Sequence, residues 1–212
     1  MTTDELDSAA VLEAIRTTRA MRRLETRDIP DEVLHQILDA AIRAPSGSNQ
    51  QTWSFIIVKD AATKRELQRL YAEVAGRYFQ SAPTTVSDGS GAETMSRVRS
   101  SAQHLAENLH LAPVLVLACI SGERSFTLGS SIYPAVQNLM VAARSLGVGS
   151  TLTTFHLSRE AEVKALLGIP DDVHTAALIP LGYPAGRWGE ANRRPVDEVV
   201  YRDRYGARYW GE

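Results

Sequence analysis

The segment PDEVLHQILDAAIRAPSGSNQQTWSFIIVK, from Pro30 to Lys59, contains a helix pattern, a polar turn and a strand pattern in succession. In its first half, apolar residues recur at helical spacing, starting just after Pro30 and stopping before Pro45. From Trp53 to Lys59 the apolar residues are almost continuous, which is typical of a strand covered on both faces. The segment therefore predicts a helix joined by a short polar turn to a buried strand.

The same two patterns recur along the chain. Further helices are expected at Leu6 to Thr18, Asp60 to Arg77, Ser100 to His110, Ser130 to Leu146 and Ser158 to Leu167. Asp60 and Ser158 are the expected N-caps, Gly76 is expected near the end of its helix, and Gly147 and Gly168 are the expected terminal glycines. Further strands are expected at Val114 to Ile120, Gly149 to Phe155 and Thr175 to Gly182, and residues 81 to 96 are expected to form a loop. Helices flanking such a sheet predict a three-layer α/β or α+β domain.

The bulk composition describes an ordinary globular chain. Its 212 residues suit one domain spanning 1–212, or at most two small ones, and the hydrophobic and charged shares are 44% and 23%. The net charge of -2 gives no reason to expect nucleic acid as a partner. The single cysteine, Cys119, excludes an internal disulfide, and the most apolar run, Leu111 to Ile120, is too short to span a bilayer. With no signal-peptide pattern at the polar N-terminus, we expect a cytoplasmic protein with no membrane partner.

The C-terminal tail, about residues 183–212, is poor in aliphatic side chains of core size. It is rich in large aromatic residues instead, namely Trp188, Tyr201, Tyr205, Tyr209 and Trp210. This composition predicts a segment that wraps a partner chain.

An arginine cluster, TTRAMRR, follows the first predicted helix. Arg19, Arg22 and Arg23 lie close enough together to bind a phosphate through bidentate hydrogen bonds, as an anionic cofactor would require. The alternative is a solvated basic helix end. A nucleic-acid site is disfavoured because no aromatic residues are interleaved with the arginines.

The turn APSGSNQQTW, Ala44 to Trp53, concentrates small and amide residues. Gly47 permits close approach of a ligand to the backbone, and the neutral donors and acceptors around it suit a heteroaromatic ring. The alternative is an ordinary polar turn.

Two later segments have weaker signals. SLGVGSTLTT contains Gly147 and Gly149 but has Leu152 where a dinucleotide fingerprint needs its third glycine, and it follows a helix rather than a strand. EANRRPVDEVVYRDRYG, in isolation, is a charged surface segment. Because no nucleophile elbow, phosphate loop or zinc motif is present, cofactor chemistry is the favoured class of activity.

Taken in order, these segments resemble the FMN-dependent nitroreductase family over nearly the full chain. The resemblance is carried by Arg19 to Arg23, Pro45 to Trp53, the predicted helix Ser130 to Gly147, Thr151 to Thr154, and Arg193. It implies an α+β, three-layer α-β-α fold with a mostly antiparallel sheet, in a domain-swapped homodimer with two shared FMN sites. The tail would donate the last strand to the partner.

The resemblance also assigns residues to the FMN site. It implies that Arg19, Ala20, Arg22 and Arg193 bind the phosphate and ribityl chain. Pro45, Ser46, Gly47 and Asn49 would hold the ring and ribityl hydroxyls from the partner subunit, while Leu152, Thr153 and Thr154 would line the flavin. Two positions depart from the family pattern: Ala20 stands where the family has serine, and Thr52 stands where it has proline. Ala20 lacks the hydroxyl that the serine would donate to the phosphate, which weakens FMN binding by roughly 0.5–1.5 kcal/mol.

The activity implied is hydride transfer from NAD(P)H through FMN to a small electron-poor acceptor such as a nitroaromatic or a quinone. A dehalogenase, a flavin-cleaving enzyme or a biosynthetic dehydrogenase of the same fold is an alternative. A non-catalytic flavin-binding protein is another.

Overall fold

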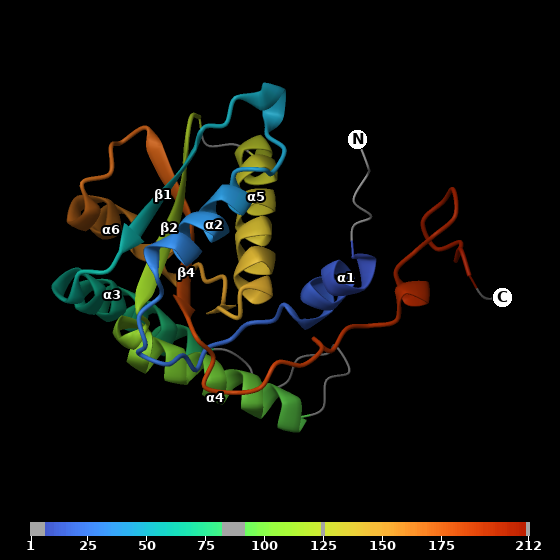
Figure 1. The fold of residues 1–212 in the computed structure, drawn as a ribbon, viewed down its shortest axis with the longest axis horizontal. Coiled ribbons are helices and arrows are strands. Elements are labelled where there is room, and N and C mark those ends of the chain that lie inside the picture. The colour runs from blue at the N-terminus through green and yellow to red at the C-terminus, as the bar shows by residue number, and fades with distance from the viewer. Residues whose placement is uncertain (1–6, 82–91, 124–125, 211–212) are drawn as a thin grey trace.

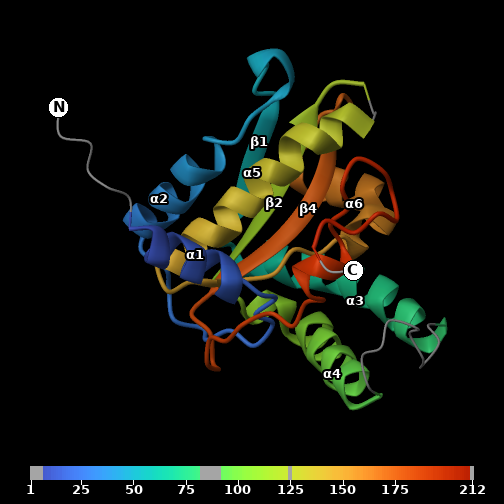
Figure 2. The same cartoon turned by 90° about the vertical axis from the view of Figure 1, so that its right-hand side faces the viewer.

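The computed structural model describes residues 7–81, 92–123 and 126–210, which form a central sheet with helices on both faces (Figure 1, Figure 2). The strands are β1 (Trp53–Val58), β2 (Val114–Ser121), β3 (Gly149–Ser150) and β4 (Val173–Gly182). They lie in the order β1-β2-β4-β3, and each neighbouring pair is antiparallel. The expected α+β class with an antiparallel sheet is confirmed.

The centre of the sheet is strand β2. Trp53 of β1 lies opposite Ile120 on one side of it, and Leu178 of β4 lies opposite Leu117 on the other. Every residue of β2 except the last is buried. Burial raises the pKa of the Cys119 thiol to about 11, as expected for an inert core cysteine.

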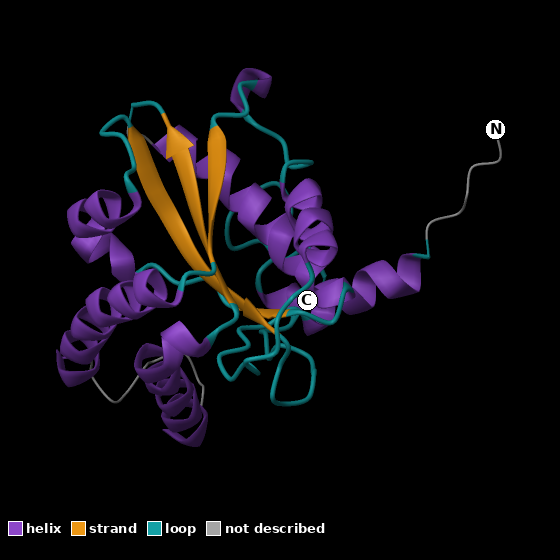
Figure 3. Ribbon diagram, turned by 60° about the vertical axis from the view of Figure 1, so that its left-hand side comes forward, coloured by secondary structure: helices purple, strands orange, loops and turns teal. Residues whose placement is uncertain are grey.

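Alternate residues of β2 point into two different hydrophobic cores. Val116 and Ala118 pack with α2 (Asp31–Ala41) and α5 (Phe126–Ser145). Leu115 and Leu117 pack on the other face with α3 (Ala61–Ser81), α4 (Ala92–Asn108) and α6 (Glu160–Leu167). Figure 3 shows the strands running between these two groups of helices.

The first and the last described segments lie outside this layered body (Figure 1). Helix α1 (Ser8–Thr17) is fixed to the C-terminal end of α5, where Arg144 Nε donates to Thr17 Oγ1 at 2.7 Å. The tail beyond Gly182 extends away from the sheet (Figure 1), and Tyr205 within it is 93% exposed. The wrapping of a partner by this tail stays a prediction. Across the described ranges, no helix combines the length and apolarity needed to cross a membrane.

The expected helices and three of the four expected strands are confirmed, with several predicted caps. The Thr63 N–H donates to Asp60 Oδ2 at 2.7 Å at the start of α3. Gly147 and Gly168 have φ values of 76° and 64°, the left-handed conformation in which helices commonly end.

The strand predicted from Gly149 to Phe155 is wrong beyond Ser150. Only Gly149–Ser150 forms a strand, Thr153 makes an isolated bridge to Leu178, and a 3-10 helix, η3, begins at Phe155 (Phe155–Arg159). Ser158 lies inside η3, so the predicted Ser158 cap is also wrong, and Arg159 precedes α6 instead.

Three helix boundaries differ from the prediction. Helix α4 includes residues 92–99, ahead of the predicted start at Ser100, and neither glycine nor proline interrupts the chain there. Helix α5 begins at Phe126, and α3 continues past Gly76 to Ser81 because a glycine costs a helix only about 1 kcal/mol, which core packing offsets. The predicted loop 81–96 is wrong at Ser81 and at residues 92–96, which are helical, and its residues 82–91 lie outside the described ranges.

Candidate functional site

The arginine segment, residues 18–25, is an extended connection between α1 and α2 that lies against the edge of the sheet. The Met21 N–H donates to the Ser150 carbonyl of β3 at 2.9 Å. On its other side, the Ala185 N–H donates to the Arg23 carbonyl at 3.0 Å. The arginine segment is therefore held between residues 149–154 and the start of the tail. These three regions are far apart in the sequence.

Arg19 and Ala20 are exposed on this segment, and Arg19 Nη2 donates to the Arg187 carbonyl at 3.1 Å. The tail follows the segment further, because the Ala191 N–H donates to the Arg16 carbonyl at 3.2 Å. Arg193 lies two residues beyond Ala191 and is exposed. Arg193 therefore lies two residues from a backbone contact with α1, and the phosphate site shared by Arg19 and Arg193 stays a prediction.

Arg22 is half-buried, and desolvation lowers the pKa of its guanidinium, with the nearby Tyr71 opposing this shift. Tyr71 is buried on α3 and forms a hydrogen bond with the side chain of Thr153. The Thr153 Oγ1 donates to the Leu178 carbonyl at 2.8 Å. Tyr71, which sequence reasoning missed, therefore lies near both Arg22 and Thr153.

No sequence signal pointed to Tyr71, which occupies an ordinary core position of an amphipathic helix. Burial raises the pKa of its phenol, while the hydrogen bond with Thr153 and the charge of Arg22 lower it.

The residues around Thr153 alternate between the interior and the surface. Thr151 is buried, and its Oγ1 has no hydrogen-bond partner among the described residues. Leu152 is 38% exposed and Thr154 is also exposed. Leu152 and Thr154 thus present an apolar group and a hydroxyl beside the arginine segment, a combination that suits a flat heteroaromatic ring with polar edges.

The polar turn holds the remaining predicted residues, Pro45, Ser46, Gly47 and Asn49. The Gly47 N–H donates to Ser131 Oγ of α5 at 3.2 Å, and the Gln51 N–H donates to Ser46 Oγ at 3.1 Å. Asn49 has a φ of 54°, in the left-handed region, and residues held in such sparsely populated conformations are common at ligand-binding sites. The Asn49 Oδ1 accepts from Gln51 Nε2 at 3.0 Å.

Within one chain these two groups of residues do not meet. The turn contacts Ser131 near the start of α5, whereas α1 and the arginine segment lie at the end of α5, near Arg144. At about 1.5 Å per helical residue, the two contacts are roughly 20 Å apart along α5. Figure 1 and Figure 2 both show the turn and the arginine segment at opposite ends of this helix.

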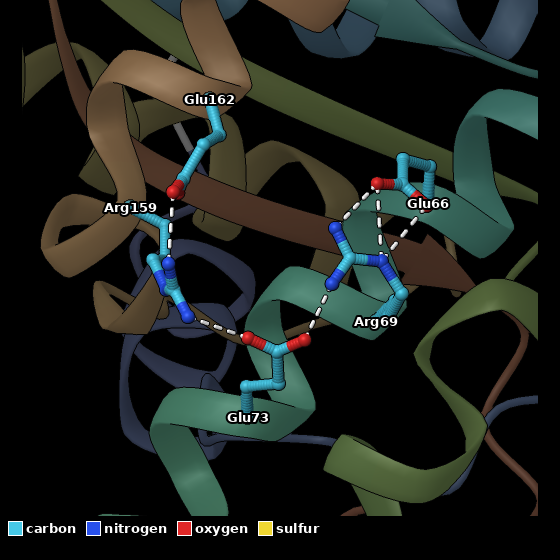
Figure 4. Close-up of polar contacts among 5 residues, drawn as sticks. All are labelled: Glu66, Arg69, Glu73, Arg159 and Glu162. Carbon is cyan, nitrogen blue, oxygen red and sulfur yellow. Dashed lines mark hydrogen bonds and ion pairs between the residues drawn. The ribbon is translucent and has the colours of Figure 1, made fainter.

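An ion network holds the segment that follows Thr154 (Figure 4). Arg159 of η3 donates to Glu73 of α3 at 2.6 Å and to Glu162 at 2.8 Å. Glu73 also accepts from Arg69, which pairs with Glu66 at 2.6 Å. The network therefore ties η3, which directly follows Thr154, to α3, the helix that carries Tyr71.

The chain is similar to known proteins over most of its length. The family model named Nitroreductase family matches residues 15–183. An NADH dehydrogenase of Thermus thermophilus is 29% identical over 197 residues, covering 86% of this chain and 90% of that protein. The iodotyrosine deiodinase 1 of Rattus norvegicus is 24% identical over 201 residues, covering 89% of this chain and 67% of that protein.

A solved structure shows the same fold. The crystal structure of oxidised iodotyrosine deiodinase bound to FMN and 3-iodo-L-tyrosine has a TM-score of 0.76 at 25% identity, covering 92% of this chain and 98% of the other. The predicted nitroreductase-type fold is confirmed.

Proposed function

The chain belongs to the nitroreductase family, and from this premise we propose that it is an FMN-dependent oxidoreductase that acts as a homodimer. The proposal is carried by the separation of the predicted ligands at the two ends of α5. Each chain holds one half of a site, so two chains related by a two-fold axis would complete two sites. The apolar side chains Val11, Leu12 and Ile15, each about half exposed on α1, support an interface there.

The residues present fit the phosphate of FMN. Neither Arg19 nor Arg22 forms an ion pair with a described carboxylate, so their charges are available to an anion. Arg19 and Arg193 would bind the phosphate, and Ala20 would contact it without the hydroxyl donor that the family's serine provides.

The residues also fit the flavin ring. Leu152, Thr153 and Thr154 would line one side of it. Pro45, Ser46, Gly47 and Asn49 of the second chain would hold the ring and the ribityl hydroxyls.

Bound FMN would supply two-electron transfer between a nicotinamide and an acceptor. The chain itself contributes position and charge. Arg22 keeps a positive charge in a half-buried position, where it acts more strongly than in water on negative charge at the ring edge. The Leu178 carbonyl fixes the Thr153 hydroxyl, and the network at Arg159 holds the segment that follows. NAD(P)H is the proposed reductant, and a nitroaromatic or a quinone is the proposed acceptor.

The visible absorbance spectrum of the purified protein tests this proposal. We expect the bands of oxidised flavin, which bleach when NADH or NADPH is added without oxygen and return when a nitroarene or quinone follows. A colourless protein that stays colourless after incubation with FMN would contradict the proposal.

A dehalogenase is the second candidate, favoured by the similarity to iodotyrosine deiodinases in sequence and in structure. Iodide release from 3-iodo-L-tyrosine under a chemical reductant, measured beside nitroarene reduction, separates the two activities. Iodide release without nitroarene reduction would replace the first candidate by the second.

A further inference from the structure

A cavity of about 300 Å³ lies between the arginine segment, the C-terminal end of α4 and the 3-10 helix η2 (Leu109–Leu111) that follows α4. Its apolar lining consists of Leu24, Leu105, Leu111, Ala112 and Ala185. Its polar lining consists of Arg22, Arg23, His104 and Asn108. A lining that combines apolar side chains with a few polar groups is typical of a small-molecule site.

The charge of the cavity is unbalanced. Arg22 and Arg23 both line it, and no aspartate or glutamate is among the lining residues. Neither arginine forms an ion pair with a carboxylate in the described part of the chain. Burial lowers the pKa of Arg22, because no anion there offsets the cost of desolvating its charge. A partly enclosed positive cavity of this kind attracts anions.

The donors on the polar side are held in place by one another. Arg23 Nη1 donates to His104 Nδ1 at 3.1 Å. Because a guanidinium can only donate, His104 Nδ1 accepts, and in the neutral ring the hydrogen is on Nε2. Asn108 Nδ2 donates to the main-chain carbonyl of His104 at 2.9 Å and lies 3.4 Å from His104 Nδ1. His104 and Arg23 are therefore positioned before any ligand binds, which lowers the entropic cost of binding.

We propose that this cavity binds a small organic anion, in which a carboxylate or phosphate is carried on an apolar body. Arg23 and Arg22 would bind the anionic group, with the His104 Nε2–H as a further donor. The leucines that line the cavity would contact the apolar body. Arg23, His104 and Asn108 are outside the proposed flavin ligands, so the site does not depend on the proposed function. Arg22 belongs to both sets, and it would link occupancy of the cavity to the flavin edge.

Isothermal titration calorimetry tests the proposal on the protein as purified, with any bound flavin retained. Benzoate and phenyl phosphate serve as the two anionic probes, inorganic phosphate tests the need for an apolar body, and benzamide is the neutral control. We expect saturable binding of at least one organic anion and no measurable binding of benzamide. The stronger probe shows whether the site prefers a carboxylate or a phosphate.

Matched variants locate the binding. Arg23→Gln removes the main donor, and we expect it to weaken binding about tenfold or more, as the loss of a charge-assisted hydrogen bond predicts. His104→Leu should weaken binding as well. Arg27→Gln removes the same charge from the same connection at an exposed position outside the cavity, and we expect less than about a twofold change.

Any one of these results would overturn the proposal: no saturable binding of either organic anion, equal affinity for benzamide, or unchanged affinity in Arg23→Gln. Binding seen only after flavin removal would also overturn it, because the anion would then occupy the flavin phosphate position. The circular dichroism of each variant shows that the fold is intact.

Discussion

Gly182 lies so close to Leu24 that a Cβ atom on the glycine would be 2.9 Å from the Cβ of Leu24. Gly149, its direct partner in the sheet, is similarly close to the arginine segment, because a Cβ there would be 3.0 Å from the Cβ of Met21. The paired glycines form a flat surface on which the arginine segment rests. The arginine cluster can therefore lie close to Thr153 only because Gly149 and Gly182 have no Cβ atom.

The first prediction concerns this contact. Gly182→Ala should displace the arginine segment, lower the free energy of unfolding by about 1–3 kcal/mol and weaken FMN binding. Urea unfolding and a flavin fluorescence titration measure the two effects. Gly76→Ala is the control, since a Cβ at Gly76 meets nothing within 4 Å and a helical alanine should stabilise by up to about 1 kcal/mol. Equal stability and FMN affinity in Gly182→Ala and the unmodified protein would contradict the prediction.

The second prediction concerns the missing phosphate donor. Ala20 is exposed beside Arg19, and Ala20→Ser restores the hydroxyl of the family pattern. We expect FMN affinity to rise by roughly 0.5–1.5 kcal/mol, or up to about tenfold. Titration of flavin-free protein with FMN measures this, and Ala161→Ser, exposed on α6, serves as the control. An unchanged or lower affinity in Ala20→Ser would show that position 20 does not contact the phosphate.

The sequence was sufficient to predict the helices and strands that form the layers of the fold. It was not sufficient to predict which segments contact one another. Helical spacing and near-continuous apolar runs predicted the helices and the strands β1, β2 and β4. This succeeded because the buried positions of a helix or strand are occupied by apolar residues at the spacing of that element. The prediction for Gly149–Phe155 failed because its threonine-rich composition suits a strand, whereas only Gly149 and Ser150 pair with β4. Thr153 instead bonds to Leu178 through an isolated bridge.

The candidate site divides in the same way. The arginine cluster and the amide-rich turn were visible as local composition, but their placement at opposite ends of α5 is a property of the tertiary structure. Tyr71 was not predictable, since its hydrogen bond with Thr153 joins residues far apart in the chain.

A third prediction concerns the ion network around Glu73. This carboxylate accepts from Arg69 and from Arg159, so Glu73→Gln weakens the link between α3 and η3. Because both pairs are partly exposed, we expect a loss of only about 1 kcal/mol, which shrinks at about 1 M salt. Glu162→Gln, which breaks only a local pair with Arg159, should cost about 0.5 kcal/mol or less. Urea unfolding at low and high salt measures both, and a loss in Glu73→Gln that is independent of salt would contradict the electrostatic explanation.

A fourth prediction concerns acid stability. His156 is 1% exposed, and neither ring nitrogen has a hydrogen-bond partner among the described residues. Burial lowers the pKa of His156 to about 4, with Glu160 opposing the shift. In the unfolded chain its pKa returns to about 6.5. As pH falls from about 6.5 towards 4, the unfolded state therefore takes up a proton that the folded state does not, and up to roughly 3 kcal/mol of stability is lost.

The variant His156→Leu tests this assignment. It should remove this part of the pH dependence and leave stability near neutral pH equal or higher, because no hydrogen bond is lost. Unfolding free energies measured across this pH range decide the matter. An unchanged acid profile in His156→Leu would assign the effect to another group.

The most direct measurement of a flavin site shared between two chains uses mixed dimers. One chain carries Arg19→Ala with Arg22→Ala, the other carries Gly47→Val with Asn49→Ala, and two affinity tags isolate the mixed dimer. Each parent homodimer should bind little FMN, because both of its sites are damaged. The mixed dimer should bind about one FMN per dimer, because one of its sites receives both intact segments and the other receives neither. A mixed dimer as empty of FMN as its parents would contradict a site built from two chains.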